Sequence, residues 1–268
     1  RSWVEQGEGR PVVMIHGLAG NLHNFTYALT GDLARDHRVI ALDRPGCGYS
    51  ERESDELARI PNQARMIADF LREEGIEQPL LVGHSLGGAI SLALALDHRE
   101  QVGGLALISP LVGVQENAPS VFSGIDVSNP AVRSFIANTL AIPASIRNGS
   151  KTLEAIFAPD VPPADFAMRG GGVLAMRPRA FYAAATDLQA VPLDMREQSQ
   201  RYGELDLPVG MFYGEDDRVL SASDQIAALK AGLPEFDLET LPGRGHMPVI
   251  VEAERTAAFI RRMAQRLD

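Results

Sequence analysis

The stretch that most constrains this chain is Gly83-His84-Ser85-Leu86-Gly87-Gly88, because a strand pattern ends just before it and a helix pattern begins just after it. Pro79-Leu80-Leu81-Val82 is a short apolar run typical of a buried strand, and residues 89–96 are mostly good helix formers. A turn this tight predicts a strained backbone at its apex, with glycines leaving room for strand and helix to approach. The sequence therefore predicts that Ser85 projects its hydroxyl beside the free N–H groups of a helix start.

Two plainer interpretations of the same stretch have to be weighed. A phosphate-binding loop has a similar glycine spacing, but it needs Lys and then Ser or Thr after the last glycine. The chain has Ala89 and Ile90 at those positions, which excludes that loop. A glycine-rich turn with an incidental serine remains possible unless a base and an acid follow in suitable places.

Strand and helix patterns alternate through both ends of the chain. Apolar runs predict strands at residues 2–5, 11–15, 38–42, 79–82, 105–108, 209–213 and 236–241. Helical spacing of apolar residues predicts helices near residues 60–74, 222–231 and 253–266. This alternation predicts an α/β fold, with a mostly parallel central sheet flanked by helices and a site beyond the carboxyl ends of the strands.

The alternation stops between Pro110 and Asp206, where prolines and short helical patterns dominate. Those patterns cover residues 131–140, 150–157 and 179–187, and Gly170-Gly171-Gly172 interrupts them. A segment of this length is too long for a loop in a compact domain. We therefore expect a core domain formed by residues 1–109 and 207–268, with residues 110–206 inserted as a helical cap over the strand ends.

A base and an acid follow two later strands. Gly243-Arg244-Gly245-His246 comes after the last strand, and Gly214-Glu215-Asp216-Asp217 comes after the strand at 209–213. Both segments lie at carboxyl ends of strands, on the rim that carries Ser85. A serine hydroxyl needs a base to take its proton, and a carboxylate can hold that imidazole in one tautomer. Three acidic residues in a row leave the partner of His246 open, although the Gly-x-x-Asp spacing favours Asp217.

Together these motifs resemble the α/β-hydrolase family over essentially the whole chain. The resemblance rests on His16-Gly17, Asp43 with Gly46 and Gly48, the Ser85 turn, the Gly-x-x-Asp at 214 to 217, and Gly245-His246. It implies Ser85 as nucleophile, His246 as base and Asp217 as acid. It also implies an oxyanion hole from the backbone N–H groups of Leu18 and Leu86, and it identifies the insertion with the family's cap.

The residues around Ser85 resemble those of esterases and lipases, which predicts cleavage of small to medium apolar carboxylic esters through an acyl-enzyme. Lactone or amide hydrolysis and carbon–carbon cleavage of 2-hydroxy-6-oxo-dienoates stay open. The carbon–carbon hydrolases use a cap arginine to hold a carboxylate, for which Arg177 is a candidate. His23 and Asn24 follow the oxyanion loop and are further candidate substrate contacts. A small-molecule binding protein that keeps the triad is the alternative from another class.

Composition limits the partners and cofactors. The net charge of −10 and the lack of a basic cluster argue against nucleic acid. Cys47 is the only cysteine, so an internal disulfide and a thiolate metal site are excluded and a cytoplasmic location is favoured. No metal motif or dinucleotide fingerprint is present, so we expect no cofactor, and no apolar run has membrane-spanning length. The chain begins at Arg1 within a strand pattern, so we expect residues upstream, with a removed signal or anchor as an alternative.

Overall fold

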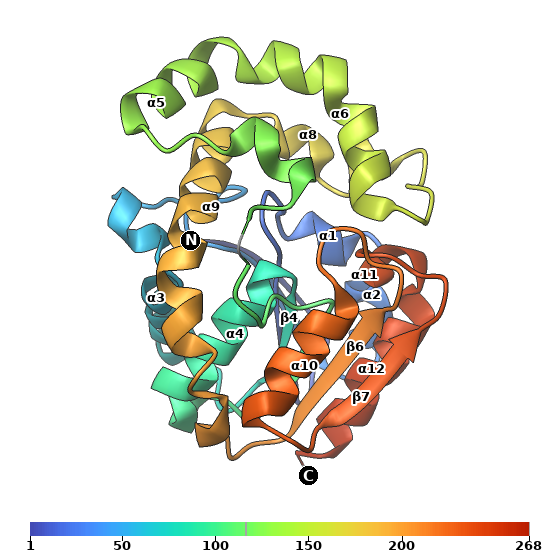
Figure 1. The fold of residues 1–268 in the computed structure, drawn as a ribbon. Helices are drawn as coiled ribbons and strands as arrows, with labels where there is room; N and C mark the ends of the chain where they lie inside the picture. Colours follow the sequence, from blue (N-terminus) through green and yellow to red (C-terminus); the bar gives the residue numbers. More distant parts are fainter. Residues whose placement is uncertain (116, 268) are drawn as a thin grey trace.

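A seven-stranded sheet in the order β1-β3-β2-β4-β5-β6-β7 runs through the centre of the computed structural model, which describes residues 1–115 and 117–267 (Figure 1). Its strands are β1 (Ser2–Gln6), β2 (Pro11–Ile15), β3 (Arg38–Asp43), β4 (Leu80–His84), β5 (Gly104–Ile108), β6 (Val209–Gly214) and β7 (Asp237–Leu241). β1 pairs antiparallel with β3, and the other pairs are parallel. The predicted mostly parallel sheet is confirmed, with β7 at an edge.

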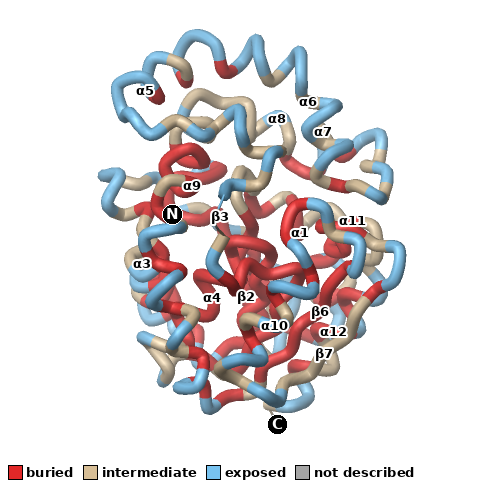
Figure 2. The backbone as a smooth tube through the Cα atoms, viewed as in Figure 1, coloured by how far each residue is buried: buried red, intermediate tan, exposed pale blue. Residues whose placement is uncertain are grey.

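Each face of the sheet is covered by its own apolar cluster. Val13 and Ile15 of β2 belong to one cluster, and Val12 and Met14 belong to the other. Burial on both faces is why the inner strands are unbroken apolar runs instead of alternating ones (Figure 2). The first face carries α3 (Ile60–Glu73), α4 (Leu86–Asp97) and α10 (Ala222–Gly232); the second carries α1 (His23–Thr26), α2 (Thr30–Leu33), α11 (Pro248–Val251) and α12 (Ala253–Gln265).

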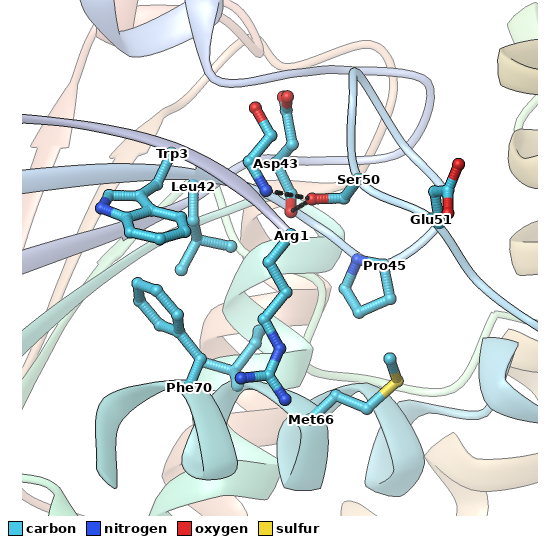
Figure 3. Close-up of a pocket in the computed structure, with 11 residues that line it drawn as sticks. Arg1, Trp3, Leu42, Asp43, Pro45, Ser50, Glu51, Met66 and Phe70 are labelled. Atoms are coloured by element: carbon cyan, nitrogen blue, oxygen red, sulfur yellow. Dashed lines mark hydrogen bonds between the residues drawn. The ribbon is translucent and has the colours of Figure 1, made fainter. Parts of the chain in front are cut away.

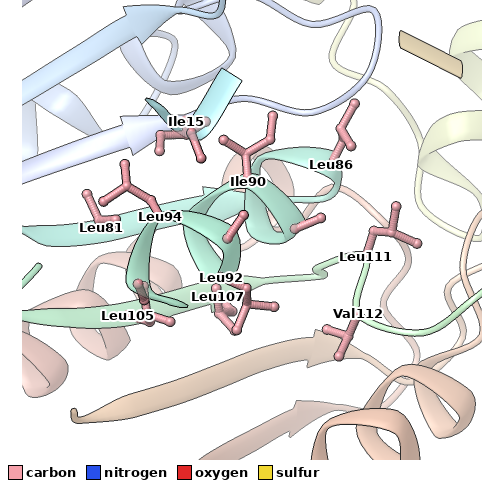
Figure 4. Packing of buried hydrophobic residues seen from close by; sticks show 14 of the residues in the cluster. Ile15, Leu81, Leu86, Ile90, Leu92, Leu94, Leu105, Leu107, Leu111 and Val112 are labelled. Atoms are coloured by element: carbon pink, nitrogen blue, oxygen red, sulfur yellow. The ribbon is translucent and has the colours of Figure 1, made fainter. Parts of the chain in front are cut away.

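Helix α4 is the most deeply buried helix of the core, and its first ten residues are all buried. Figure 4 shows Ile90 and Leu94 on the side of the helix that faces Ile15 and Leu81. The helix also starts against the end of β2, because a Cβ at Gly87 would lie 2.0 Å from the Ile15 carbonyl oxygen. Only glycine therefore fits at this position.

The edge strand β1 is tied to the loop that follows β3. The Ser50 hydroxyl donates to the Asp43 carbonyl at 2.8 Å and accepts from the Ser2 N–H at 2.9 Å (Figure 3). The Trp3 ring packs edge-on against Phe70 of α3, with 5.0 Å between ring centroids. A small pocket lies among these residues, away from Ser85.

The segment predicted as a cap, called the cap below, consists of helices joined by short turns and lies above the carboxyl ends of the strands (Figure 1). Its elements are η3 (Ser120–Ile125), α5 (Pro130–Thr139), α6 (Ala141–Phe157), α7 (Phe166–Arg169), α8 (Gly172–Ala175) and α9 (Pro178–Gln198). The remaining 3-10 turns are η1 (Asp55–Ala58), η2 (Arg99–Gln101) and η4 (Tyr202–Glu204). Within the described part of the chain, no helix combines the length and apolarity that crossing a bilayer requires.

Two cap helices are longer than the sequence predicts. Helix α6 starts at Ala141 and not near 150. Pro143 does not prevent this early start, because it lies in the first helical turn, where a missing N–H costs little. Helix α9 continues past 187 and through Pro192 to Gln198. Its second half is held on the core, where the Gln198 amide donates to the Ala89 carbonyl at 2.9 Å and Asp194 accepts from the Ile60 N–H at 2.9 Å. These tertiary contacts offset the hydrogen bond that Pro192 removes.

The contact between α4 and β2 predicts that a single methyl group added at Gly87 destabilises the fold. Gly87→Ala should lower the free energy of unfolding by about 2 kcal/mol or more, because the new Cβ would overlap a backbone carbonyl that cannot move aside. Gly31→Ala is the matched control, since a Cβ added there would have nothing within 4 Å. Urea unfolding of the two variants measures the difference, and equal midpoints would contradict this account.

Candidate active site

Ser85 occupies the turn between β4 and α4 in a conformation that ordinary residues rarely adopt. Its φ of 54° and ψ of −121° confirm the predicted strain. The turn is held from both sides: the Ser85 N–H donates to the Ile108 carbonyl at 3.1 Å, and the Ser85 carbonyl accepts from Gly88 and Leu111 at 2.9 and 3.0 Å. The strand–turn–helix segment therefore fixes the position of the serine backbone.

His246 and Asp217 form a buried pair on the loops after β7 and β6. The His246 Nδ1 lies 2.6 Å from the Asp217 Oδ2. The other carboxylate oxygen accepts from the N–H groups of Val219 and Leu220 at 2.7 and 3.0 Å, so the carboxylate cannot rotate freely. This arrangement gives the imidazole a fixed orientation.

The neighbouring acidic residues are engaged elsewhere. Glu215 accepts from the Thr240 hydroxyl at 2.6 Å, and Asp216 accepts from the Gly243 N–H at 2.9 Å. Of the three consecutive acidic residues, Asp217 is thus the one that the structure places against His246, as the Gly-x-x-Asp spacing predicts.

His84, the residue before the serine, links the Ser85 turn to the His246 loop. Its Nε2 lies 2.9 Å from the His246 carbonyl, and the two rings are 5.1 Å apart. Burial, and then the nearby His246, lower the pKa of His84 to about 3. His84 is therefore neutral at physiological pH, with Nε2 as the donor to that carbonyl.

The loop that follows β2 and carries Leu18, called the oxyanion loop here after its predicted role, lies directly against Ser85. A Cβ at Gly17 would be 2.8 Å from the Ser85 Cβ and 3.3 Å from its Oγ. Leu18, from this loop, and Leu86, the first residue of α4, both line the pocket that contains Ser85. The two residues whose N–H groups are predicted to form the oxyanion hole therefore lie on either side of Ser85.

His16 braces this loop from behind. Its Nε2 accepts from the Arg44 N–H at 3.0 Å, so the proton lies on Nδ1, which is 2.9 Å from the Gly17 carbonyl. Burial, and then the positive charge of Arg44, hold the pKa of His16 well below its usual value. The loop is thus anchored by a second neutral histidine.

The pocket over Ser85 encloses about 580 Å³, part of it open to solvent. None of the described residues that line it is charged, and Gln115 is the one polar side chain besides Ser85. The cap supplies its roof through η3 and α9. The lining residues are Leu18, Ser85, Leu86, Leu111, Gln115, Ala118, Pro119, Phe122, Leu188, Val191, Pro192, Val219 and Leu220.

Three predicted substrate contacts lie outside this lining, because each side chain is held elsewhere. His23 lies with Nδ1 3.2 Å from the Thr26 hydroxyl, and Asn24 donates to the Gly170 carbonyl at 2.9 Å. Arg177 donates to the Gly48 carbonyl at 3.2 Å, with its guanidinium 5.0 Å from the centre of the Tyr49 ring. In this structure Asn24 and Arg177 join the cap to the core instead of facing Ser85.

Sequence comparison decides the family. The sequence matches the alpha/beta hydrolase fold family across residues 10–253. This chain belongs to the α/β-hydrolase fold family. The predicted fold is confirmed at the level of the family as well as of the sheet.

Curated relatives of this hydrolase differ in how much of the chain they match. The 2-hydroxy-6-oxo-6-phenylhexa-2,4-dienoate hydrolase of Burkholderia cepacia is 28% identical over 247 residues, which is 90% of this chain and 83% of that enzyme. The dihydrolipoyllysine-residue acetyltransferase component of the acetoin cleaving system from Cupriavidus necator is 40% identical over 107 residues. That match spans 39% of this chain and only 28% of the relative.

Solved structures share the fold of the hydrolase at lower identity. An alpha/beta hydrolase fold protein from Burkholderia ambifaria superposes with a TM-score of 0.80 at 24% identity, covering 96% of this chain and 91% of that one. A putative aryl esterase from Burkholderia cenocepacia has a TM-score of 0.78 at 22% identity, covering 98% and 95%. At these identities the likeness concerns the fold.

A cluster of charged and amide side chains beneath the oxyanion loop was not among the predicted site residues. It joins Arg44, Arg52 and Gln63 of the core to Asp187 of α9. The available signals were weak: Arg44 follows the strand at 38–42, and Asp187 is a lone carboxylate in the Ala-rich stretch at 183–190. Neither identifies a partner far away in the sequence.

The contact between His246 and Asp217 predicts which acid matters for turnover. Asp217→Asn should lower kcat by roughly 10⁴-fold, because the amide favours the wrong imidazole tautomer. Asp216→Asn and Glu215→Gln are matched controls that change neighbouring carboxylates without touching the imidazole, and each should stay near the wild-type rate. A larger loss in either control than in Asp217→Asn would contradict the assignment.

The buried neutral His84 predicts a dependence of stability on pH. Its pKa is about 3 in the folded state against 6.5 for the free group, so the unfolded chain binds more protons between these values. The free energy of unfolding should therefore decrease as the pH falls below about 6.5. His84→Gln keeps an N–H donor but cannot titrate, so its slope between about pH 4 and pH 6 should be smaller by up to about 1.4 kcal/mol per pH unit.

Urea unfolding at a series of pH values measures both slopes. His16 is present in both proteins, so its own contribution cancels in the comparison. Equal slopes would show that His84 is protonated in the folded state.

Proposed function

We propose that this protein is a serine hydrolase that cleaves carboxylic esters of small to medium apolar acids or alcohols through an acyl-enzyme. Ser85 is the nucleophile, His246 the base and Asp217 the acid of a Ser-His-Asp triad. The observation that carries the proposal is the uncharged, apolar pocket that contains Ser85 and has the oxyanion loop on its wall.

The contacts around the triad support this chemistry. Because Asp217 holds His246 through Nδ1, the Nε2 of the imidazole is left to accept the proton of the Ser85 hydroxyl as the oxygen attacks the ester carbonyl. The N–H groups of Leu18 and Leu86 stabilise the negative charge that develops on the carbonyl oxygen. His246 then protonates the departing alcohol, and a water molecule activated by the same imidazole releases the acid.

The pocket supports an apolar substrate. Burial of a methylene group contributes about 0.8 kcal/mol, so affinity should increase with chain length until the cap obstructs the substrate. The walls that set this limit come from the cap, with Phe122 on η3 and Leu188 and Val191 on α9. A substrate with a free carboxylate would find no cation among the described lining residues.

Carbon–carbon cleavage of 2-hydroxy-6-oxo-dienoates is the second candidate, because the Burkholderia cepacia relative that matches over 90% of this chain is a dienoate hydrolase. That reaction needs a cation near the substrate carboxylate. Arg177 is the predicted candidate, but its guanidinium is occupied by Gly48 and Tyr49. A triad-bearing binding protein, the third candidate, would bind apolar ligands without turning them over.

A series of p-nitrophenyl esters from acetate to laurate tests the proposal. The value of kcat/KM should increase by up to about fourfold per methylene and then decrease, and Ser85→Ala should lower kcat by roughly 10⁴–10⁶-fold. A fluorophosphonate should label the wild type and not Ser85→Ala. Full labelling of Ser85→Ala would refute Ser85 as the nucleophile.

The same preparation separates the alternatives. Fast cleavage of a 2-hydroxy-6-oxo-dienoate that collapses in Arg177→Ala, beside weak ester turnover, would support the carbon–carbon hydrolase instead. Ester turnover that does not change in Arg177→Ala supports the esterase. Ligand binding without any turnover or labelling would support the binding protein.

A further inference from the structure

Arg44, at the end of β3, is a fully buried arginine that faces the backbone of the oxyanion loop. Its Nε donates to the His16 carbonyl at 2.9 Å, and its Nη2 donates to the Gly17 carbonyl at 3.0 Å. One rigid guanidinium therefore holds the two consecutive carbonyls that precede Leu18. The His16 imidazole, bound to the backbone N–H of the same arginine, completes the anchor.

The geometry of a peptide unit gives this anchor a consequence at Ser85. The Gly17–Leu18 bond is trans, so the N–H of Leu18 points away from the carbonyl that Arg44 holds. Fixing the Gly17 carbonyl therefore fixes the direction of the N–H that the oxyanion hole uses. The positive charge at the carbonyl also polarises the peptide unit and strengthens its N–H as a donor.

The other end of the guanidinium contacts the cap. The Arg44 Nη1 donates to the Asp187 Oδ2 at 2.8 Å and to the Gln63 Oε1 at 2.7 Å. Asp187 lies on α9, the helix that also lines the pocket, and its carboxylate is fully buried. Arg52 binds the second Asp187 oxygen at 2.5 Å, and its other hydrogen bonds within the described chain go to the Pro45 and Ala183 carbonyls, not to those of His16 and Gly17.

Stability alone is a poor explanation for this cluster. A buried ion pair is often no more stabilising than packed apolar side chains, because desolvating the charges offsets their attraction. The charged cluster instead fixes an orientation. It forms hydrogen bonds at defined angles between helix α9 and two backbone carbonyls beside Ser85.

We propose that Arg44 is a positioning residue for the oxyanion hole, and that its ion pair with Asp187 makes the geometry of the hole depend on the seating of α9 in the cap. The inference rests on the proposed serine hydrolase activity. It adds that the cap acts on the rate of the chemical step, as well as on the size of the substrate.

Steady-state kinetics with p-nitrophenyl butyrate and inhibition by butylboronic acid test the proposal. The boronate forms a tetrahedral adduct on the serine, so its affinity depends on the oxyanion hole. Arg44→Met should lower kcat and weaken the boronate by about 10²-fold each, with KM changed by less than about threefold. Asp187→Asn should lower both by about tenfold, since the amide keeps a hydrogen bond but loses the charge.

Arg52→Met is the matched control, because it removes the other cation on Asp187 and leaves the oxyanion loop untouched. It should lower kcat and boronate affinity by no more than about tenfold, as Asp187→Asn does, because Arg44 still holds both carbonyls. If Arg52→Met lost as much as Arg44→Met, the cluster would act only through general stability and the proposal would be refuted.

Circular dichroism and thermal unfolding establish that each variant is folded. Where Arg44→Met does not fold, Arg44→Lys takes its place, since a compact ammonium keeps the charge but cannot span both carbonyls and the carboxylate. The same split between kcat and KM is expected. A folded variant at position 44 with unchanged kcat and boronate affinity would overturn the proposal.

The rate of fluorophosphonate labelling separates this proposal from the proposed function. A wild type that is neither labelled nor active on esters refutes the serine hydrolase and, with it, the role of Arg44. A wild type that is labelled, with variants at position 44 labelled equally fast, refutes the positioning role alone.

Discussion

The site depends on how closely the first turn of α4 approaches the end of β2. With no Cβ at Gly87 or Gly17, the helix start and the oxyanion loop both fit against the Ser85 turn. At this contact Ser85 has a positive φ, and the start of α4 lies beside its side chain. Because the same contact is part of the core packing, the protein cannot fold without also forming the Ser85 turn and its surroundings.

Near that contact, two of the three neighbouring histidines are buried in environments that keep them uncharged. His84 and His16 are both buried with lowered pKa values, and each uses a ring nitrogen to hold a backbone carbonyl next to the site. Both side chains are therefore neutral at the pH at which a histidine base works, and they hold the backbone by hydrogen bonds. The proposed proton chemistry therefore involves His246 and neither of the other two histidines near the site.

The sequence predicts those parts of the molecule that local patterns determine. Strands buried on both faces are continuous apolar runs, and parallel strands bring their carboxyl ends to one rim, so the neighbourhood of Ser85, Asp217 and His246 follows from their order. Contacts between distant side chains leave no such pattern. Arg44 and Asp187 are 143 residues apart, and His84 and His246 are 162 apart. The extent of α9 likewise depends on contacts with α3 and α4 that no local rule contains.

The long cap helix α6 has a consequence for how this family member can diversify. Of its 17 residues only Ala141 and Phe157 are buried (Figure 2). The ring centroids of Phe157 and Phe166 lie 4.9 Å apart. A segment with so few buried contacts opens locally at low free energy, and its amides should exchange hydrogen long before those of the sheet. Mutations at the exposed positions between these two ends should therefore change the free energy of unfolding little, whereas Leu153 and Ile156 are half-buried against the core. The exposed residues on the outer surface of the cap can therefore change, in evolution or by design, while the core retains its fold.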